Sequence, residues 1–206
     1  MARGRKMKKQ IKLFAGCIVL IIVAYAYAHI AKTVSIYDKE IDPSQYGSTG
    51  IIIDQAVSQS FVVEENAIDS VRIKTSVVGN VNDISLSYEV ENSETGEICA
   101  QGEEEAEKVK NGKFFELKFP KVENVKGKKM KITIWAEGAN AENGVSFAFE
   151  KKVENDTEYK VNGQGQEGTL ILKTVNHRFD FETFSVFIGF AVYIYVFMRF
   201  LYKLFQ

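Results

Sequence analysis

The sequence predicts an all-β fold, a jelly-roll-like antiparallel β-sandwich flanked by two single transmembrane α-helices. Three observations lead to this prediction. An uncharged apolar run lies near each end of the 206-residue chain, and short segments between the runs alternate apolar with polar residues. Positive charge is concentrated beside the apolar runs, whereas acidic residues dominate between them. The predicted parts are a basic cytoplasmic tail (1–12), transmembrane helix 1 (13–31), a connector (32–56), an extracytoplasmic β-sandwich (57–176), a juxtamembrane segment (177–182) and transmembrane helix 2 with a short cytoplasmic end (183–206).

The first apolar run, 13–31, contains no Asp, Glu, Lys or Arg. Its length suits the roughly 20 helical residues that cross a hydrocarbon core, and lipid favours a helix because the backbone groups must pair internally. Positively charged residues are concentrated on its N-terminal side, which predicts that the N-terminus is cytoplasmic. These charges are Arg3, Arg5, Lys6, Lys8, Lys9 and Lys12. A cleaved signal peptide is the alternative, since 26–28 reads Ala-Tyr-Ala.

The second apolar run, 183–198, is followed by Arg199 and Lys203, whose long side chains can reach a headgroup region. Both termini are then cytoplasmic, and the central domain of this plasma-membrane protein is extracellular. The alternative is a buried C-terminal helix of a soluble domain. Aromatic residues surround the predicted helix on every side, which is typical of membrane helices or of helices in a deep core.

The central region is acidic. Residues 33–180 carry 17 Lys and Arg against 26 Asp and Glu, a net charge of 17 − 26 = −9. Phosphate backbones require a basic surface, so the composition argues against a nucleic-acid partner. Solubility is the simplest role for this excess of acid.

Strict alternation predicts strands that bury one face and expose the other. Turn signals containing Gly, Asn or Asp separate these strands, as in an antiparallel sandwich. The predicted strands are 58–63, 70–75, 84–90, 97–100, 115–119, 130–136, 145–150, 158–161 and 169–173. Residues 103–110 are expected to form a single helical turn or a loop, and 163–168 a flexible turn.

The sequence does not predict an enzyme, a cofactor or a metal site. Its two histidines, His29 and His177, lack neighbours at metal-ligand spacing. A pair of carboxylates is not informative in so acidic a domain.

Three aromatic residues are candidates for ligand binding. Trp135 is the single tryptophan, and by parity it shares a face with Lys131 and Thr133, away from the apolar face. An outward aromatic ring on a sandwich can stack on a sugar. The alternative is that the ring packs under a loop or at the rim of the sandwich. Tyr88 and Tyr159 carry the same two interpretations.

The segments 59–61, 68–73, 94–98, 115–119, 125–134, 156–163 and 168–173 carry a family resemblance. With these segments, the stretch 59–174 resembles the galactose-binding-like jelly-roll modules of Gram-positive cell-surface and membrane proteins. Such modules are often attached to multi-spanning glycosyltransferases or polysaccharide-assembly proteins. The multi-spanning catalytic part is absent from this sequence, so the resemblance implies a module that serves a partner.

The predicted function is therefore a non-catalytic accessory or scaffold subunit of a membrane glycosyltransferase or envelope polysaccharide assembly complex. Small residues four apart, Ala24 and Ala28 in helix 1 and Ser185 and Gly189 in helix 2, allow close helix packing. That packing joins either a partner protein or the chain's own helices. The alternatives are a stand-alone membrane-tethered carbohydrate-binding module that holds envelope glycan and a polysaccharide chain-length regulator.

Overall fold

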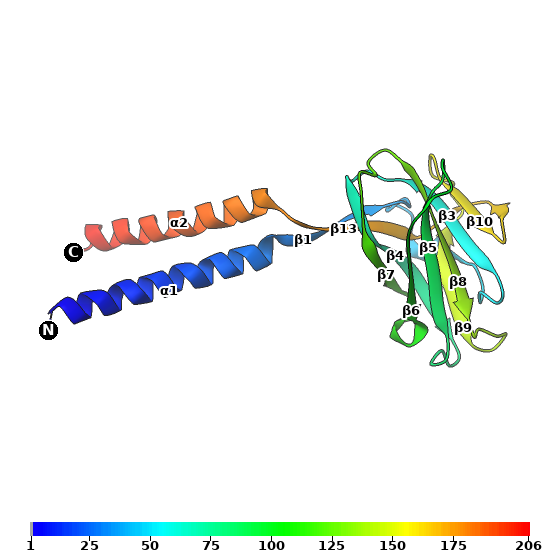
Figure 1. The fold of residues 1–206 in the computed structure, drawn as a ribbon, viewed down its shortest axis with the longest axis horizontal. Helices are drawn as coiled ribbons and strands as arrows, with labels where there is room; N and C mark the ends of the chain where they lie inside the picture. Colours follow the sequence, from blue (N-terminus) through cyan, green and yellow to red (C-terminus); the bar gives the residue numbers. More distant parts are fainter. Residues whose placement is uncertain (1) are drawn as a thin grey trace. The chain divides into compact units, whose positions relative to one another are not determined.

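The computed structural model describes residues 2–206, without the side chains of 2–9, 12 and 13. The chain forms two compact units, a helical unit (1–31 and 177–206) and a sandwich unit (32–176). Two antiparallel sheets build the sandwich unit (Figure 1), which confirms the predicted β-sandwich.

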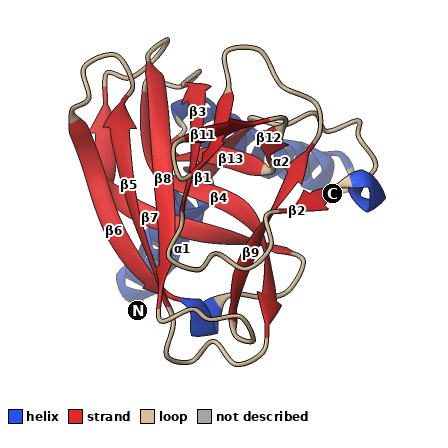
Figure 2. Ribbon diagram, turned by 90° about the vertical axis from the view of Figure 1, so that its right-hand side faces the viewer, coloured by secondary structure: helices blue, strands red, loops and turns tan. Residues whose placement is uncertain are grey.

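The six-stranded sheet has the order β11-β10-β3-β8-β5-β6, and β5, β6 and β8 lie side by side in Figure 2. Alternation sets its faces: in β8, Ile132 and Ile134 are fully buried, whereas Lys131, Thr133 and Trp135 are partly exposed. The parity predicted for Trp135 is therefore confirmed. The strands are β3 (Ala56–Val62), β5 (Ser85–Asn92), β6 (Ile98–Glu105), β8 (Lys129–Glu137), β10 (Glu158–Val161) and β11 (Gln164–Gln166).

The seven-stranded sheet has the order β1-β13-β4-β9-β12, with β7 paired to β4 and β2 paired to β9. Its strands are β1 (His29–Ser35), β2 (Gly47–Ser48), β4 (Ala67–Val78), β7 (Lys113–Glu123), β9 (Gly144–Glu150), β12 (Thr169–Leu170) and β13 (Leu172–Phe179). The core between the sheets takes the apolar face of every long strand, with Phe61, Leu117 and Phe147 among its fully buried side chains.

The segment predicted as a connector is built into the sandwich. The Ile36 amide donates to the Leu172 carbonyl at 2.9 Å, the short 3-10 helix η1 (Pro43–Gln45) turns the chain, and β2 joins β9. Ile52 is only 2% exposed and belongs to the core. Within the apolar stretch 51–53, Ile52 is thus a core residue outside any strand, and its amide donates to the Val145 carbonyl of β9 at 3.1 Å.

Residues 103–110 combine the end of β6 with η2 (Ala106–Lys108), a single 3-10 turn. The predicted flexible turn at 163–168 instead contains β11, which pairs with β10. Gln164 and Gln166 there provide backbone partners for β10, a role that does not depend on apolar alternation.

The helical unit contains α1 (Ala2–Ala28) and α2 (Phe181–Leu204), which pack side by side (Figure 1). α1 ends three residues before the predicted boundary at 31, because His29 begins β1. The Asp180 amide donates to the Ala28 carbonyl at 2.8 Å, and the Asp180 side chain caps α2 by accepting from the Thr183 amide.

One described helix, α2, is long and apolar enough to cross a membrane, whereas the apolar part of α1, Phe14–Ala28, is shorter. The span predicted over 13–31 therefore stays a prediction. Of the charges used for topology, Arg199 and Lys203 lie exposed near the end of α2. The side chains of Arg3, Arg5, Lys6, Lys8, Lys9 and Lys12 lie outside the described residues.

Candidate functional site

Trp135 lies on the outer face of the six-stranded sheet, near the C-terminal end of the central strand β8. Its register partners are Ala56 of β3 and Ser87 of β5, both small residues. Small neighbours leave the sides of the indole uncovered. Trp135 is partly exposed, and no ring contact or hydrogen bond to it occurs among the described residues. A buried Trp usually has a hydrogen-bond partner for its N–H. The N–H of the partly exposed Trp135 has none among the described residues, so it is available to a ligand.

An open depression lies on each side of Trp135. The first has a volume of about 540 Å³ and is lined by Asp54, Gln55, Glu137 and Asn162 among others. Asn162 is fixed there because its Oδ1 accepts from the Ala56 amide at 3.0 Å. The second depression, of about 400 Å³, lies beyond Ser87 and is lined by Gln101 and Glu103 of β6.

The two depressions surround an aromatic ring with carboxylates and amides. The Ser87 hydroxyl donates to Glu137 Oε1 at 3.3 Å, which positions that carboxylate beside the ring. Sugar-binding sites combine an apolar stacking platform with a few placed polar groups that fix orientation. Trp135, Glu137, Gln101 and Asn162 supply both kinds of group.

The two tyrosines proposed with Trp135 lie in the core. Tyr88 is 1% exposed, and its hydroxyl donates to the Lys118 carbonyl of the opposite sheet. Burial raises the pKa of Tyr88 to about 12. Its ring lies across Gly102 of β6, where a Cβ would meet the Tyr88 hydroxyl oxygen at 2.4 Å. The Tyr88 ring is placed to pack the sandwich, and the residue also belongs to the lining of the second depression.

Tyr159 is 4% exposed, and its ring centroid lies 5.6 Å from that of Phe149. Burial raises its pKa as well. The alternation of 84–90 already indicated an inward Tyr88, because it shares parity with Ile84, Leu86 and Val90.

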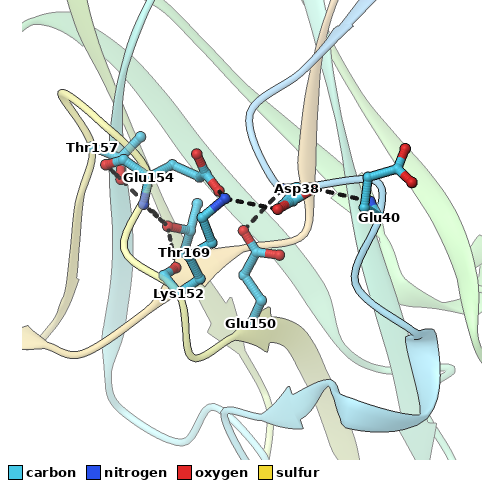
Figure 3. A network of polar contacts seen from close by, with 7 residues as sticks. All are labelled: Asp38, Glu40, Glu150, Lys152, Glu154, Thr157 and Thr169. Carbon is cyan, nitrogen blue, oxygen red and sulfur yellow. Dashed lines mark hydrogen bonds and ion pairs between the residues drawn. The ribbon is translucent and has the colours of Figure 1, made fainter.

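A second polar cluster joins the segment after β1 to the loop after β9 (Figure 3). The Lys152 ammonium lies 2.7 Å from Asp38 Oδ2 and 2.7 Å from Glu154 Oε1. Thr169 donates to the Lys152 carbonyl and accepts from the Glu154 amide, both at 3.0 Å. These contacts fasten three segments that are distant in sequence.

Glu150 is the buried member of this cluster. It is 1% exposed, and its Oε1 accepts from the Asp38 amide at 3.0 Å. Burial raises the pKa of Glu150, whereas the hydrogen bond with Lys152 lowers the pKa of Asp38 and raises that of Lys152. Lys152 already pairs with both Asp38 and Glu154, so this Glu150 cluster stabilises the contact between the segments. Within the described residues, no group of three His, Cys, Asp or Glu side chains is arranged to hold a metal ion.

The predicted helix-packing residues divide into two sets. Ala24 and Ala28 of α1 are fully buried. Ser185 and Gly189 of α2 are exposed, and nothing outside its own helix backbone lies within 4 Å of a Cβ placed at Gly189. The alanines therefore pack within the helical unit, whereas Ser185 and Gly189 point away from α1.

Residue patterns alone did not single out Asp54, Glu103 or Glu137. Glu137 has the parity of Trp135 and was identifiable from it. Glu103 comes near Trp135 only through the register of β5 with β6, which alternation along a single strand does not give.

No family model matches the chain, and no curated protein matches it. Solved structures that are similar to it include carbohydrate-binding modules. The xylan-binding module CBM15 is 10% identical over 74% of this chain and 99% of its own, with a TM-score of 0.36. CsCBM6-3 from Clostridium stercorarium, in complex with cellobiose, is 11% identical over 58% of this chain and 89% of its own, with a TM-score of 0.31.

A clostridial cysteine protease, Cwp84 after propeptide cleavage, is 12% identical with a TM-score of 0.44. The similarity covers 70% of this chain but only 39% of the protease chain. At these identities and TM-scores, the similarity transfers neither a ligand nor an activity to this chain.

Proposed function

We propose that this protein is a membrane-anchored, non-catalytic glycan-binding module. The observation that carries the proposal is Trp135, a partly exposed indole without partners among the described residues, between two depressions lined by polar groups. One face of the indole stacks on a sugar ring, and the surrounding amides and carboxylates accept or donate hydrogen bonds to its hydroxyls.

The proposal includes a topology. α1 and α2 both cross the plasma membrane, both termini are cytoplasmic, and the sandwich unit is extracellular. The apolar composition of α2 and the positive charges at both ends of the chain support this arrangement.

The topology is tested by labelling intact cells with a membrane-impermeant maleimide. In a variant without Cys17 and Cys99, we expect Ser44→Cys to react from outside and Gln206→Cys to react only after lysis. Labelling of Gln206→Cys on intact cells would overturn the two-span arrangement.

Glycan binding is tested with the full-length protein in mild detergent. Because Trp135 is the single tryptophan, its fluorescence reports directly on the site. We expect an envelope glycan to shift the emission of the wild-type protein, and Trp135→Ala to lose retention on the immobilised glycan. Phe114→Ala, on the other sheet, is the control and retains binding. Equal retention of wild type and Trp135→Ala would contradict the proposal.

A second candidate is the accessory subunit of a glycosyltransferase or polysaccharide assembly complex. The exposed pair Ser185 and Gly189 favours it, because small residues let the backbone of a partner's transmembrane helix approach closely. Affinity purification in mild detergent, with mass spectrometry of co-purifying proteins, tests this role. A multi-spanning partner should be recovered with wild type and lost with Gly189→Leu, but retained with the nearby Val192→Leu. A chain-length regulator carries long helices in its outer domain, whereas the helices described within 32–176 are two 3-10 turns of three residues each.

A further inference from the structure

Some acids on the outer face of the six-stranded sheet have cationic partners. Lys131 Nζ lies 2.5 Å from Glu91 Oε1, and Lys160 Nζ lies 2.9 Å from Glu158 Oε1 in β10, two strands from β8. Each of these two carboxylates is paired within the protein.

The acids that line the two depressions beside Trp135 have no cationic partners among the described residues. Asp54 and Glu137 line one depression and Glu103 lines the other. None of the three forms an ion pair among the described residues, and the one hydrogen bond to Glu137 comes from the neutral Ser87 hydroxyl. No Lys or Arg belongs to the described lining of either depression.

The nearest lysine along β8 is Lys131, four residues from Trp135. At a rise of about 3.4 Å per residue, that separation is about 14 Å, which exceeds the screening length of roughly 8 Å at physiological ionic strength. Lys131 is also committed to Glu91. Lys160, two strands away on β10, is likewise committed to Glu158. The carboxylates beside the indole are therefore available to a cation from outside the protein.

We propose that the Trp135 surface selects a glycan that carries positively charged amino groups, such as a polymer of hexosamine without N-acetyl groups. This inference rests on the proposed glycan binding. The C–H face of the sugar ring stacks on the indole, and its ammonium group reaches Asp54, Glu103 or Glu137.

Two physical effects act in the same direction. The electron-rich face of Trp attracts a cation, and of the aromatic side chains it does so most strongly. A carboxylate about 4 Å from an ammonium adds a Coulomb attraction that weakens with salt. An uronic acid or a phosphate-bearing glycan meets the same carboxylates as like charges, so the site discriminates against anionic polymers.

The experiment uses full-length protein in detergent and three probes of similar length. These are glucosamine oligomers, the matched N-acetylglucosamine oligomers and oligogalacturonate. We expect the glucosamine oligomer to bind at least about tenfold more tightly than its acetylated form, and oligogalacturonate not to bind. Trp135 fluorescence and calorimetry measure the three affinities, and the preference for glucosamine should shrink at high salt.

Two variants and one control locate the preference. Glu103→Gln and Glu137→Gln should each weaken binding of the glucosamine oligomer more than binding of the acetylated oligomer, and so reduce the preference for the amine. Glu94→Gln changes the net charge equally but lies in the exposed turn between β5 and β6, so it should behave as wild type.

The outcomes separate the two proposals. If no sugar binds, the glycan-binding function itself fails. If the acetylated and free-amine oligomers bind equally, glycan binding stands and the selection for amines is overturned. If Glu94→Gln weakens amine binding as much as Glu103→Gln, the attraction belongs to the acidic domain as a whole, which also overturns the inference.

Discussion

The aromatic residues on the outer faces of the two sheets differ in whether other side chains cover their rings. On the seven-stranded sheet, Tyr37 stacks on Phe114 with ring centroids 6.2 Å apart, and Tyr46 meets Tyr37 edge-on at 6.4 Å. Lys173 Nζ lies 4.3 Å from the Phe114 ring centroid, and Lys74 Nζ lies 5.1 Å from that of Tyr46. Each ring on this face is covered by another ring, by a lysine or by both.

On the six-stranded sheet, Trp135 is left without such a cover among the described residues. The difference arises from the chain path. The segment after β1 supplies Tyr37 and Tyr46 to the first face, whereas no described residue places an aromatic ring or a lysine against Trp135. An outward aromatic residue on a sandwich is therefore informative about ligand binding only once the path of the flanking segments is known.

The largest effect is expected for an aromatic residue between the sheets. Tyr88→Ala removes a 1% exposed ring that spans to the Lys118 carbonyl. We expect a loss of about 3–5 kcal/mol in the free energy of unfolding, as for other buried aromatic truncations. Denaturant unfolding followed by near-ultraviolet circular dichroism measures it. A loss below about 1 kcal/mol would show that the ring does not hold the sheets together.

Truncation of a covered outer ring should have a smaller effect. Phe114 is 36% exposed and packs under Tyr37 and Lys173. Because part of the ring already contacts water, we expect Phe114→Ala to cost about 1–2 kcal/mol, below the range for full burial. The same unfolding experiment checks it, with Phe114→Leu as the milder control.

Removal of the charge that covers these rings comes next. Lys173→Met retains most of the apolar stem and removes the ammonium over Phe114. A cation–π contact at an exposed site contributes about 0.5–1 kcal/mol, so we expect a loss of that size in the free energy of unfolding. An unchanged value would indicate that the stem alone covers the ring.

The Glu150 cluster fixes the segment that supplies Tyr37, and its contribution to stability depends on pH. Burial raises the pKa of Glu150 in the folded protein, so the folded state binds the proton more tightly than the unfolded state. This contribution to stability is fully present below the unfolded pKa and is lost as pH rises through the higher folded pKa.

Glu150→Gln removes the titration and retains an acceptor for the Asp38 amide. Relative to wild type, we expect the Tm of Glu150→Gln to rise with pH across the window above the ordinary glutamate pKa. Thermal unfolding over a pH series measures the difference, and a difference independent of pH would contradict the raised pKa.

The smallest effect on stability is expected at Trp135. Because its ring makes no aromatic contact or hydrogen bond among the described residues, Trp135→Ala should change the free energy of unfolding by about 0.5 kcal/mol or less. A loss comparable to that of Phe114→Ala would mean that Trp135 is a packing residue, and the contrast between the two faces would disappear.

Alternation in the sequence predicted the long strands well, because each buries one face. The run 84–90 lies almost entirely in β5, and 130–136 lies within β8, so the outward direction of Trp135 was predictable. β1, β2 and β11 were not predicted. β1 and β2 pair with β13 and β9, which are distant in sequence, and β2 has only two residues, too few to show a period. β11 pairs with the adjacent β10, but its sequence Gln-Gly-Gln contains no apolar residue.

The acids beside Trp135 show the same limit. Alternation places a residue on a face, but it does not give the register between strands. Glu103 is near Trp135 only because Ser87 pairs with Glu103 on one side and with Trp135 on the other. The position of Tyr88, by contrast, follows from alternation alone, because its parity with Leu86 and Val90 already indicated the core.

The neighbouring positions of β1 and β13 have a consequence for the two helices. As an unfolded tether, the roughly 145 residues of the sandwich unit would have a radius of gyration of about 40 Å. Once folded, the same residues leave the sheet on adjacent strands, which are spaced by about 5 Å. Folding therefore brings the two ends of the domain close together and raises the effective concentration of one helix for the other. Association of α1 with α2 is thereby coupled to the folding of the domain, and a mutation that unfolds the sandwich will also weaken the helix pair.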